Sequence, residues 1–135
     1  MIGLALALLV IGGASGTLLR HVVQILPILP VLVVLRRRPA SGAYAALAIF
    51  SIWIGIVVLI WLFLLGASRI ANGHYTPIEI ALTFVMAACS LSGAFASFLL
   101  GRSLSLLRRV VTFVLFGVLQ VVAMWVSFLG PITNR

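Results

Sequence analysis

The chain has 135 residues, of which 64% are hydrophobic and 7% are charged, with a net charge of +8 and a mean hydropathy of +1.38. A soluble globular domain carries roughly 25% charged residues, so this composition excludes that class and predicts an all-α, polytopic bundle of transmembrane helices. No polar segment is long enough for a separate soluble domain. We therefore expect residues 1–135 to form a single membrane domain with four to five membrane segments.

The first apolar region, residues 2–35, allows three interpretations. In one, a hairpin crosses the membrane twice with Arg20 and His21 at its turn, although a second limb over residues 22–35 is short and contains two prolines. In another, one broken helix crosses once from about residue 18, after a segment that lies near the outer interface. A signal peptide is the third, but no basic region precedes the apolar stretch. We expect a broken or hairpin-like segment with Arg20 and His21 on the outer side.

Three further apolar segments follow, at residues 43–67, 78–101 and 110–130. Each matches the length of about 20 residues that a helix needs to cross a hydrocarbon core about 30 Å thick. Apart from Glu79, near the start of the second, none of them contains a charged residue. They predict three transmembrane helices.

The arginines predict the orientation. The linkers before the first and third of these segments hold six of the nine basic residues, namely Arg36, Arg37, Arg38, Arg102, Arg108 and Arg109. The intervening loop and the C-terminal tail hold one each, Arg69 and Arg135. The positive-inside rule places the arginine-rich linkers in the cytoplasm and argues against insertion in both directions. Every basic residue is arginine, which we attribute to a GC-rich genome, and we expect the bacterial plasma (inner) membrane.

The loop at residues 68–77 ends in a helix-start signal. Thr76-Pro77-Ile78-Glu79 has the spacing of a capping box, in which the Thr hydroxyl caps the amide of Glu79 and the carboxylate reaches back. We also expect Glu79 to pair with Arg69. The alternative role for this lone carboxylate, at a membrane boundary, is that of a proton or cation acceptor.

A stripe of small residues predicts close helix packing in the segment at residues 78–101. Gly93, Ser97 and Gly101 recur every four residues and so lie on one helical face. Small residues let helix backbones approach closely within a membrane. We expect this face to contact another helix of the same chain, the alternative being a second protein.

Residues that could perform chemistry are few. The chain has one carboxylate, two histidines and one cysteine, and it lacks a nucleophile beside a base, a carboxylate pair and a phosphate-binding loop. We therefore expect no enzyme activity, no cofactor and no metal. The arginines lie beside apolar runs instead of among aromatic residues, which argues against nucleic acid. Gln120, an amide at mid-segment, needs a partner from another helix or a solute pathway.

One local resemblance bears on function. Gly12-Gly13-Ala14-Ser15-Gly16-Thr17-Leu18-Leu19-Arg20-His21 resembles the opening helix of the small four-helix fluoride channels, which has a Gly-Gly-x-x-Gly pattern followed by an arginine and an aromatic residue. The second helix here lacks the family's Asn and the third lacks its Thr-Thr-Phe-Ser break. The resemblance implies an oligomeric ion or small-solute channel in which Arg20 takes the position of the family's arginine. Arg20, His21 and Gln120 would then be pathway contacts.

Two functions follow as expectations. The first is a non-catalytic accessory or structural membrane protein, whose contacts are the lipid bilayer and either a partner membrane subunit or further copies of the chain. The second is the oligomeric channel or transporter. Polar residues lining a pathway would distinguish the second from the first.

Overall fold

The computed structural model describes residues 1–68 and 75–129, and within these ranges the chain forms six α-helices, one short 3-10 helix and no strand. This confirms the all-α prediction. Four helical stretches are long and apolar enough to cross a membrane: Leu18–Arg37, Pro39–Leu64, Pro77–Ser103 and Leu106–Ser127.

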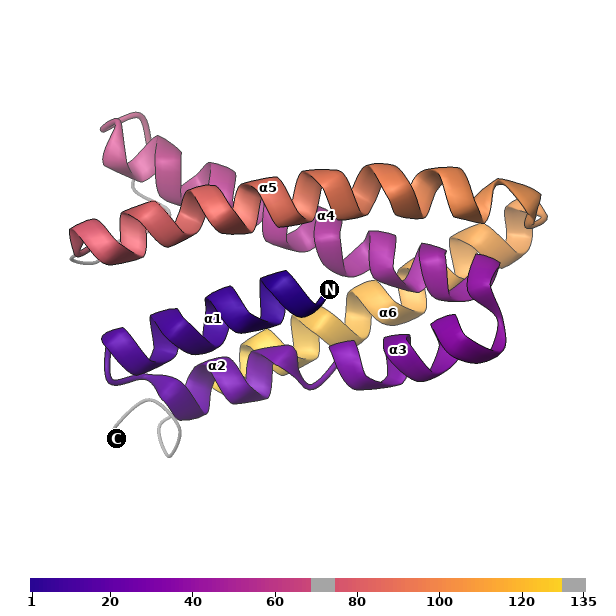
Figure 1. Ribbon diagram of the computed structural model, residues 1–135, viewed down its shortest axis with the longest axis horizontal. Coiled ribbons are helices and arrows are strands. Elements are labelled where there is room, and N and C mark those ends of the chain that lie inside the picture. The colour runs from indigo at the N-terminus through magenta and orange to yellow at the C-terminus, as the bar shows by residue number, and fades with distance from the viewer. Residues whose placement is uncertain (69–74, 130–135) are drawn as a thin grey trace.

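Helix α1 (Ile2–Ala14) is an additional, shorter apolar helix. Its 13 residues extend about 20 Å, too little to cross a bilayer. A tight turn in which Gly16 has a positive φ of 69° reverses the chain into helix α2 (Leu18–Ile25), so that α1 lies beside α2 along one half of the bundle (Figure 1). Leu4 and Leu8 of α1 are buried. Helix α1, which one of the interpretations placed near the outer interface, thus packs within the bundle through Leu4 and Leu8.

Helices α2 and α3 (Ile28–Arg37) together form the first long stretch. The helix is interrupted at Leu26 and Pro27, where the proline lacks the amide hydrogen that an unbroken helix would use. The stretch begins at Leu18, before Arg20, and contains 20 residues. Among the interpretations of residues 2–35, this start agrees with the broken helix from about residue 18 and not with a limb that starts at residue 22. Arg20 and His21 lie in the first turn of this long stretch.

Helices α4 (Pro39–Leu64), α5 (Pro77–Leu100) and α6 (Leu106–Ser127) follow, with a 3-10 turn, η1 (Gly101–Ser103), between the last two. Helix α5 matches its predicted bounds within one residue. Helices α4 and α6 begin four residues earlier than predicted, because proline is favoured at the first position of a helix and arginine is compatible with a helix end. The arginines therefore mark where each uninterrupted apolar run begins, but they do not mark where the helix begins.

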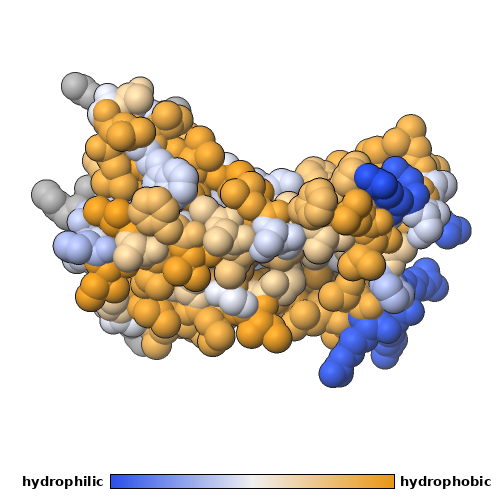
Figure 2. Space-filling view, turned by 45° about the horizontal axis from the view of Figure 1, so that its top comes forward, coloured by the Kyte–Doolittle hydropathy of each residue, from blue (hydrophilic) through white to orange (hydrophobic). Residues whose placement is uncertain are grey.

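The arginine-rich linkers lie at one end of the bundle. The α3–α4 junction and η1 are adjacent at this end (Figure 1), and the strongly hydrophilic surface of the described residues gathers there (Figure 2). Arg38 and Arg108 border the same surface depression. Arg109 donates from Nε to the carbonyl of Leu104 at 2.7 Å and lies with its guanidinium carbon 5.6 Å from the Tyr44 ring centre. The two arginine-rich linkers, which are separated along the chain by helices α4 and α5, thus lie next to each other at one end of the bundle.

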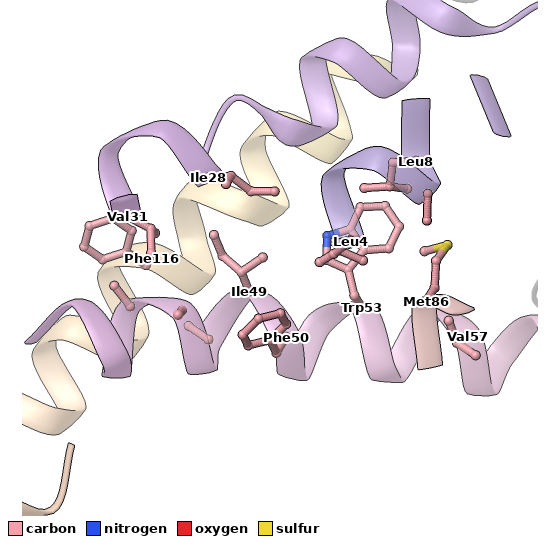
Figure 3. Close-up of a cluster of buried hydrophobic side chains, with 14 of the residues drawn as sticks. Leu4, Leu8, Ile28, Val31, Ile49, Phe50, Trp53, Val57, Met86 and Phe116 are labelled. Atoms are coloured by element: carbon pink, nitrogen blue, oxygen red, sulfur yellow. The ribbon is translucent and has the colours of Figure 1, made fainter. Parts of the chain in front are cut away.

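Helix α4 is the centre of the bundle. It contacts α3, α5 and α6, and its residues Ile49, Phe50 and Trp53 belong to a buried apolar cluster that also takes side chains from α1, α3, α5 and α6 (Figure 3). The face of α5 that contains small residues packs on this helix. A Cβ built on Gly93 would overlap the Phe50 ring, with the third-nearest ring atom at 2.8 Å.

The same contact extends toward the arginine end. Gly101 lies against the Tyr44 ring, where a Cβ would overlap it, and Ser97 between the two glycines is buried. Gly93 and Gly101 therefore face helix α4 of the same chain, which is the arrangement expected of these small residues. Neither glycine lines the cavity described next.

Candidate functional site

Five helices enclose a cavity at the end of the bundle opposite the arginines. Contacts between α1 and α2, α2 and α6, α6 and α4, α4 and α5, and α5 and α1 close a ring. The cavity has a volume of about 440 Å³, within the range of small-molecule sites. Helix α1, although too short to cross a membrane, completes the ring and thereby creates the cavity.

The lining of the cavity is divided between polar and apolar groups. Polar side chains come mainly from the helix ends: Ser15, Thr17, Arg20, His21, Gln24, Tyr75, Glu79 and Thr83. The remainder is apolar and comes from the helices around it: Leu8, Ile11, Trp53, Ile56, Leu59, Ile60, Met86, Met124 and Phe128. Since Leu8, Trp53 and Met86 also belong to the buried apolar cluster, the cavity ends at that cluster. The site is amphipathic along the bundle axis.

Arg20 is the cation of this cavity. Its guanidinium carbon lies 3.9 Å from the centre of the Phe128 ring, so one face of the cation is covered by an aromatic face. The Nε atom is buried and has no hydrogen-bond partner within residues 1–68 and 75–129. A guanidinium has five N–H donors and no acceptor. Phe128 thus covers one face of Arg20, and the buried Nε is a donor without an acceptor among these residues.

His21 is held by the turn that precedes α2. Its Nδ1 lies 3.0 Å from the carbonyl oxygen of Thr17 and 3.2 Å from the Thr17 hydroxyl, which itself lies 2.6 Å from the Ser15 hydroxyl. Because a carbonyl only accepts, Nδ1 carries the hydrogen of this bond, and in the neutral ring Nε2 is then an acceptor. The turn therefore fixes both the position and the tautomer of His21.

Glu79 occupies the capping position at the start of α5. The amide of Thr76 donates to its Oε2 at 2.7 Å and the Thr76 hydroxyl donates to the same oxygen at 2.9 Å, while the Glu79 amide donates to that hydroxyl at 3.3 Å. Burial and the neighbouring Glu79 carboxylate raise the pKa of the Tyr75 phenol, and the Arg20 guanidinium opposes them. The expected pair of Glu79 with Arg69 involves a residue that lies outside the described ranges.

Two buried amides join α2 to α6 beside the cavity. Gln24 donates from Nε2 to the Ser127 hydroxyl at 3.0 Å, and Gln120 donates from Nε2 to the backbone carbonyl of Gln24 at 3.1 Å. Gln120 is 0% exposed and is not one of the cavity-lining residues. Of the three expected pathway contacts, Arg20 and His21 line the cavity, whereas Gln120 lies behind it and joins two helices.

Sequence reasoning singled out Arg20, His21 and Glu79 and missed the other polar lining residues, which are Ser15, Thr17, Gln24, Tyr75 and Thr83. Gln24 follows Arg20 by four residues and Thr83 follows Glu79 by four, so each lies one helical turn further along the same face. Thr83 also accepts a hydrogen bond from the Trp61 indole nitrogen at 2.8 Å. The four-residue spacing is the signal that could have identified Gln24 and Thr83.

No protein-family model, curated protein or solved structure matches this chain. Within the described ranges, no group of three or more His, Cys, Asp or Glu side chains is placed to hold a metal ion. The features that bear on function are thus the amphipathic cavity at one end, the arginine cluster at the other, and the apolar outer faces between them.

Proposed function

We propose that this chain is a non-catalytic integral membrane protein with an accessory or structural role, inserted in the bacterial plasma (inner) membrane with its arginine-rich end in the cytoplasm. Its contacts are the bilayer and either a partner membrane subunit or further copies of itself. The observation that carries the proposal is the apolar outer surface of α5 and α6. Large side chains point outward along both helices, including Phe84, Leu91, Phe95, Leu100, Leu107, Leu115, Val118 and Trp125.

Such a surface favours a membrane over water. Monomeric soluble proteins rarely expose contiguous apolar patches larger than a few hundred Å², whereas lipid tails solvate them without cost. The polar side chains fit the same setting, because Gln24, Thr83 and Gln120 bond across helices and the exposed Ser92 of α5 bonds to the Ala88 carbonyl of its own helix. Nearly all of the described chain is thus devoted to helix packing and to contact with an apolar medium.

The orientation is tested with single cysteines in a Cys89→Ala background. Ser103→Cys lies in η1 at the arginine end and Ser15→Cys lies at the opposite end, and both positions are exposed. In intact cells a membrane-impermeant maleimide should label the cysteine at position 15 and leave that at position 103 unlabelled until the membrane is permeabilised. The reverse pattern would refute the proposed orientation, and labelling of both in intact cells would refute a single orientation.

The accessory role is tested by purification of the full chain with a C-terminal tag in mild detergent. Mass spectrometry of the purified material and the mass of the particle should show a stoichiometric membrane partner or a defined homo-oligomer. Material that is monomeric and free of other proteins would contradict the role. A tagged, unrelated four-span protein of the same membrane is the matched control for adventitious co-purification.

The oligomeric channel or transporter is the second candidate, and the cavity lined by Arg20 and His21 favours it. Its lining ends at Leu8, Trp53 and Met86, so a conducting state would require these residues to separate or a pathway between copies. Liposomes with purified protein should then show halide flux that Arg20→Gln abolishes and that Arg36→Gln, at the other end, leaves intact. Equal flux in wild type and Arg20→Gln would remove this candidate.

A further inference from the structure

The cavity contains a cation, Arg20, that has no anionic partner within residues 1–68 and 75–129. Arg20 and Glu79 line the same space, yet no ion pair joins them among the residues described, and Glu79 uses Oε2 to accept two hydrogen bonds from Thr76. Phe128 covers one face of the guanidinium, and the buried Nε lacks an acceptor. A guanidinium withdrawn from water is stabilised only when its donors meet acceptors, and it matches an oxyanion with two parallel bonds.

The polar end of the cavity contains a further hydrogen-bond donor, Tyr75. The Tyr75 phenol also lines the cavity, and burial and the Glu79 carboxylate raise its pKa, so the hydroxyl keeps its hydrogen at neutral pH. A hydroxyl donor beside a guanidinium suits a phosphate, whose oxygens accept from several directions, better than a carboxylate.

The shape of the cavity specifies the rest of the ligand. Beyond the polar residues the walls are formed by Ile56, Met86 and Met124, and the space ends at Trp53 and Leu8 of the apolar cluster. A free ion would leave this apolar part empty or hydrated, whereas a short hydrocarbon segment would fill it and gain from its burial. The ligand that matches both halves is amphipathic, with its charge at the mouth.

We propose that this cavity binds a phosphate-bearing amphiphile of the phospholipid class, with Arg20 as the phosphate ligand and the walls from α1, α4, α5 and α6 around its apolar part. The inference goes beyond the accessory role, which requires no ligand. It assigns α1 a purpose, because this half-length helix closes the ring of helices and contributes Leu8 and Ile11 to the wall. The phosphate could be supplied by a lipid headgroup or by free phosphate, and the test distinguishes them.

The test measures binding to the full chain in detergent micelles by isothermal titration calorimetry with three probes. Dihexanoyl phosphatidic acid carries both parts of the proposed ligand, dihexanoylglycerol carries the apolar part alone, and inorganic phosphate carries the charged part alone. We expect dihexanoyl phosphatidic acid to bind saturably at one site per chain and at least tenfold more tightly than either other probe. Dihexanoylglycerol lacks the charge-assisted contact with Arg20, and inorganic phosphate lacks the burial of apolar surface.

Three cavity variants and one control outside the cavity tie the binding to this site. Arg20→Gln should weaken dihexanoyl phosphatidic acid by about tenfold or more, and the matched charge removal Arg36→Gln, at the other end, should leave it unchanged. Glu79→Gln keeps a residue suited to the capping box and removes a like charge, so it should tighten binding by about twofold to fivefold. Ile56→Phe, which retains Arg20 and fills the apolar part, should also abolish binding and provides a second test if Arg20→Gln misfolds.

The contrary outcomes are separable. Equal affinity in Arg20→Gln and wild type, or no saturable binding of dihexanoyl phosphatidic acid, would overturn the proposal. Equal affinity for inorganic phosphate would show that the free ion is the ligand, and equal affinity for dihexanoylglycerol would show an apolar site without a phosphate ligand; each overturns the amphiphile assignment. None of these results alters the expected co-purification of a partner, so failure here differs from failure of the accessory role.

Discussion

The packing of α5 on α4 makes a sharp prediction for Gly93. A Cβ added by Gly93→Ala would overlap the end of the Phe50 ring, and its third-nearest ring atom would lie at 2.8 Å, where carbon atoms at optimal contact are about 3.5–4.0 Å apart. The ring must therefore retreat by about 1 Å. Phe50 is only 2% exposed, so there is no open space to receive it.

The expected cost of Gly93→Ala follows from this overlap. Overpacking of a well-packed core typically costs about 1–3 kcal/mol, and the higher helix propensity of alanine returns at most about 1 kcal/mol. We expect a net destabilisation of about 1–2 kcal/mol, and a larger one for Gly93→Leu. The control is Gly117→Ala in α6, where an added Cβ meets nothing within 4 Å. That change should leave stability unchanged or raise it by up to about 1 kcal/mol.

The assay is reversible unfolding of the full chain by titration of sodium dodecyl sulfate into mild-detergent micelles, followed by circular dichroism. A double variant gives the decisive comparison, because Phe50→Leu removes the ring atoms that the new Cβ would overlap. The cost of Gly93→Ala should fall by about 1 kcal/mol in that background. Stability of Gly93→Ala equal to or above that of Gly117→Ala, or an unchanged cost in the Phe50→Leu background, would refute the packing argument.

Three further predictions test other parts of the fold. Gly42→Ala should be more damaging than Gly93→Ala in the same assay, because its Cβ would overlap the backbone of Leu35, which cannot rotate away as a side chain can; a milder effect would contradict this. Thr76→Ala should cost about 1 kcal/mol through loss of the α5 cap, and no measurable change would show that the cap contributes nothing. Because the pKa of Tyr75 is raised in the folded state, its contribution to the free energy of unfolding is complete below about pH 10 and is lost as the pH rises through the folded-state pKa. The unfolding temperature should therefore fall less steeply above pH 10 in Tyr75→Phe than in wild type. Identical pH profiles would refute this.

Much of the fold could be read from local signals. The Thr76–Glu79 spacing predicts a capping box that the structure contains with both bonds, since the cap depends on four consecutive residues only. The bounds of α5 were predicted within one residue for the same reason. The N-terminal region could not be read this way, because the start of α2 at Leu18 and the reversal at Gly16 depend on where α1 finds a packing partner.

The candidate site was predicted only in part. Arg20 and Glu79 are conspicuous in so apolar a chain, but they are separated by 58 residues of sequence and nothing local indicates that they line one cavity. Gln120 was singled out as a mid-segment amide in need of a partner. Its partner is the backbone carbonyl of Gln24 in α2, which no side-chain pattern could identify.

The sequence by itself determined the all-α, strongly apolar character of the chain, three of the four long apolar helices and the grouping of arginines at alternate linkers, because the transfer free energy of each residue and the length of each run are properties of the chain alone. Only the tertiary structure decided that α1 folds back to close a ring of five helices, and that Arg20, His21 and Glu79 line one cavity. Those outcomes depend on the rotation of each helix about its axis and on which small residues allow close approach, and both are set by contacts between residues distant in sequence.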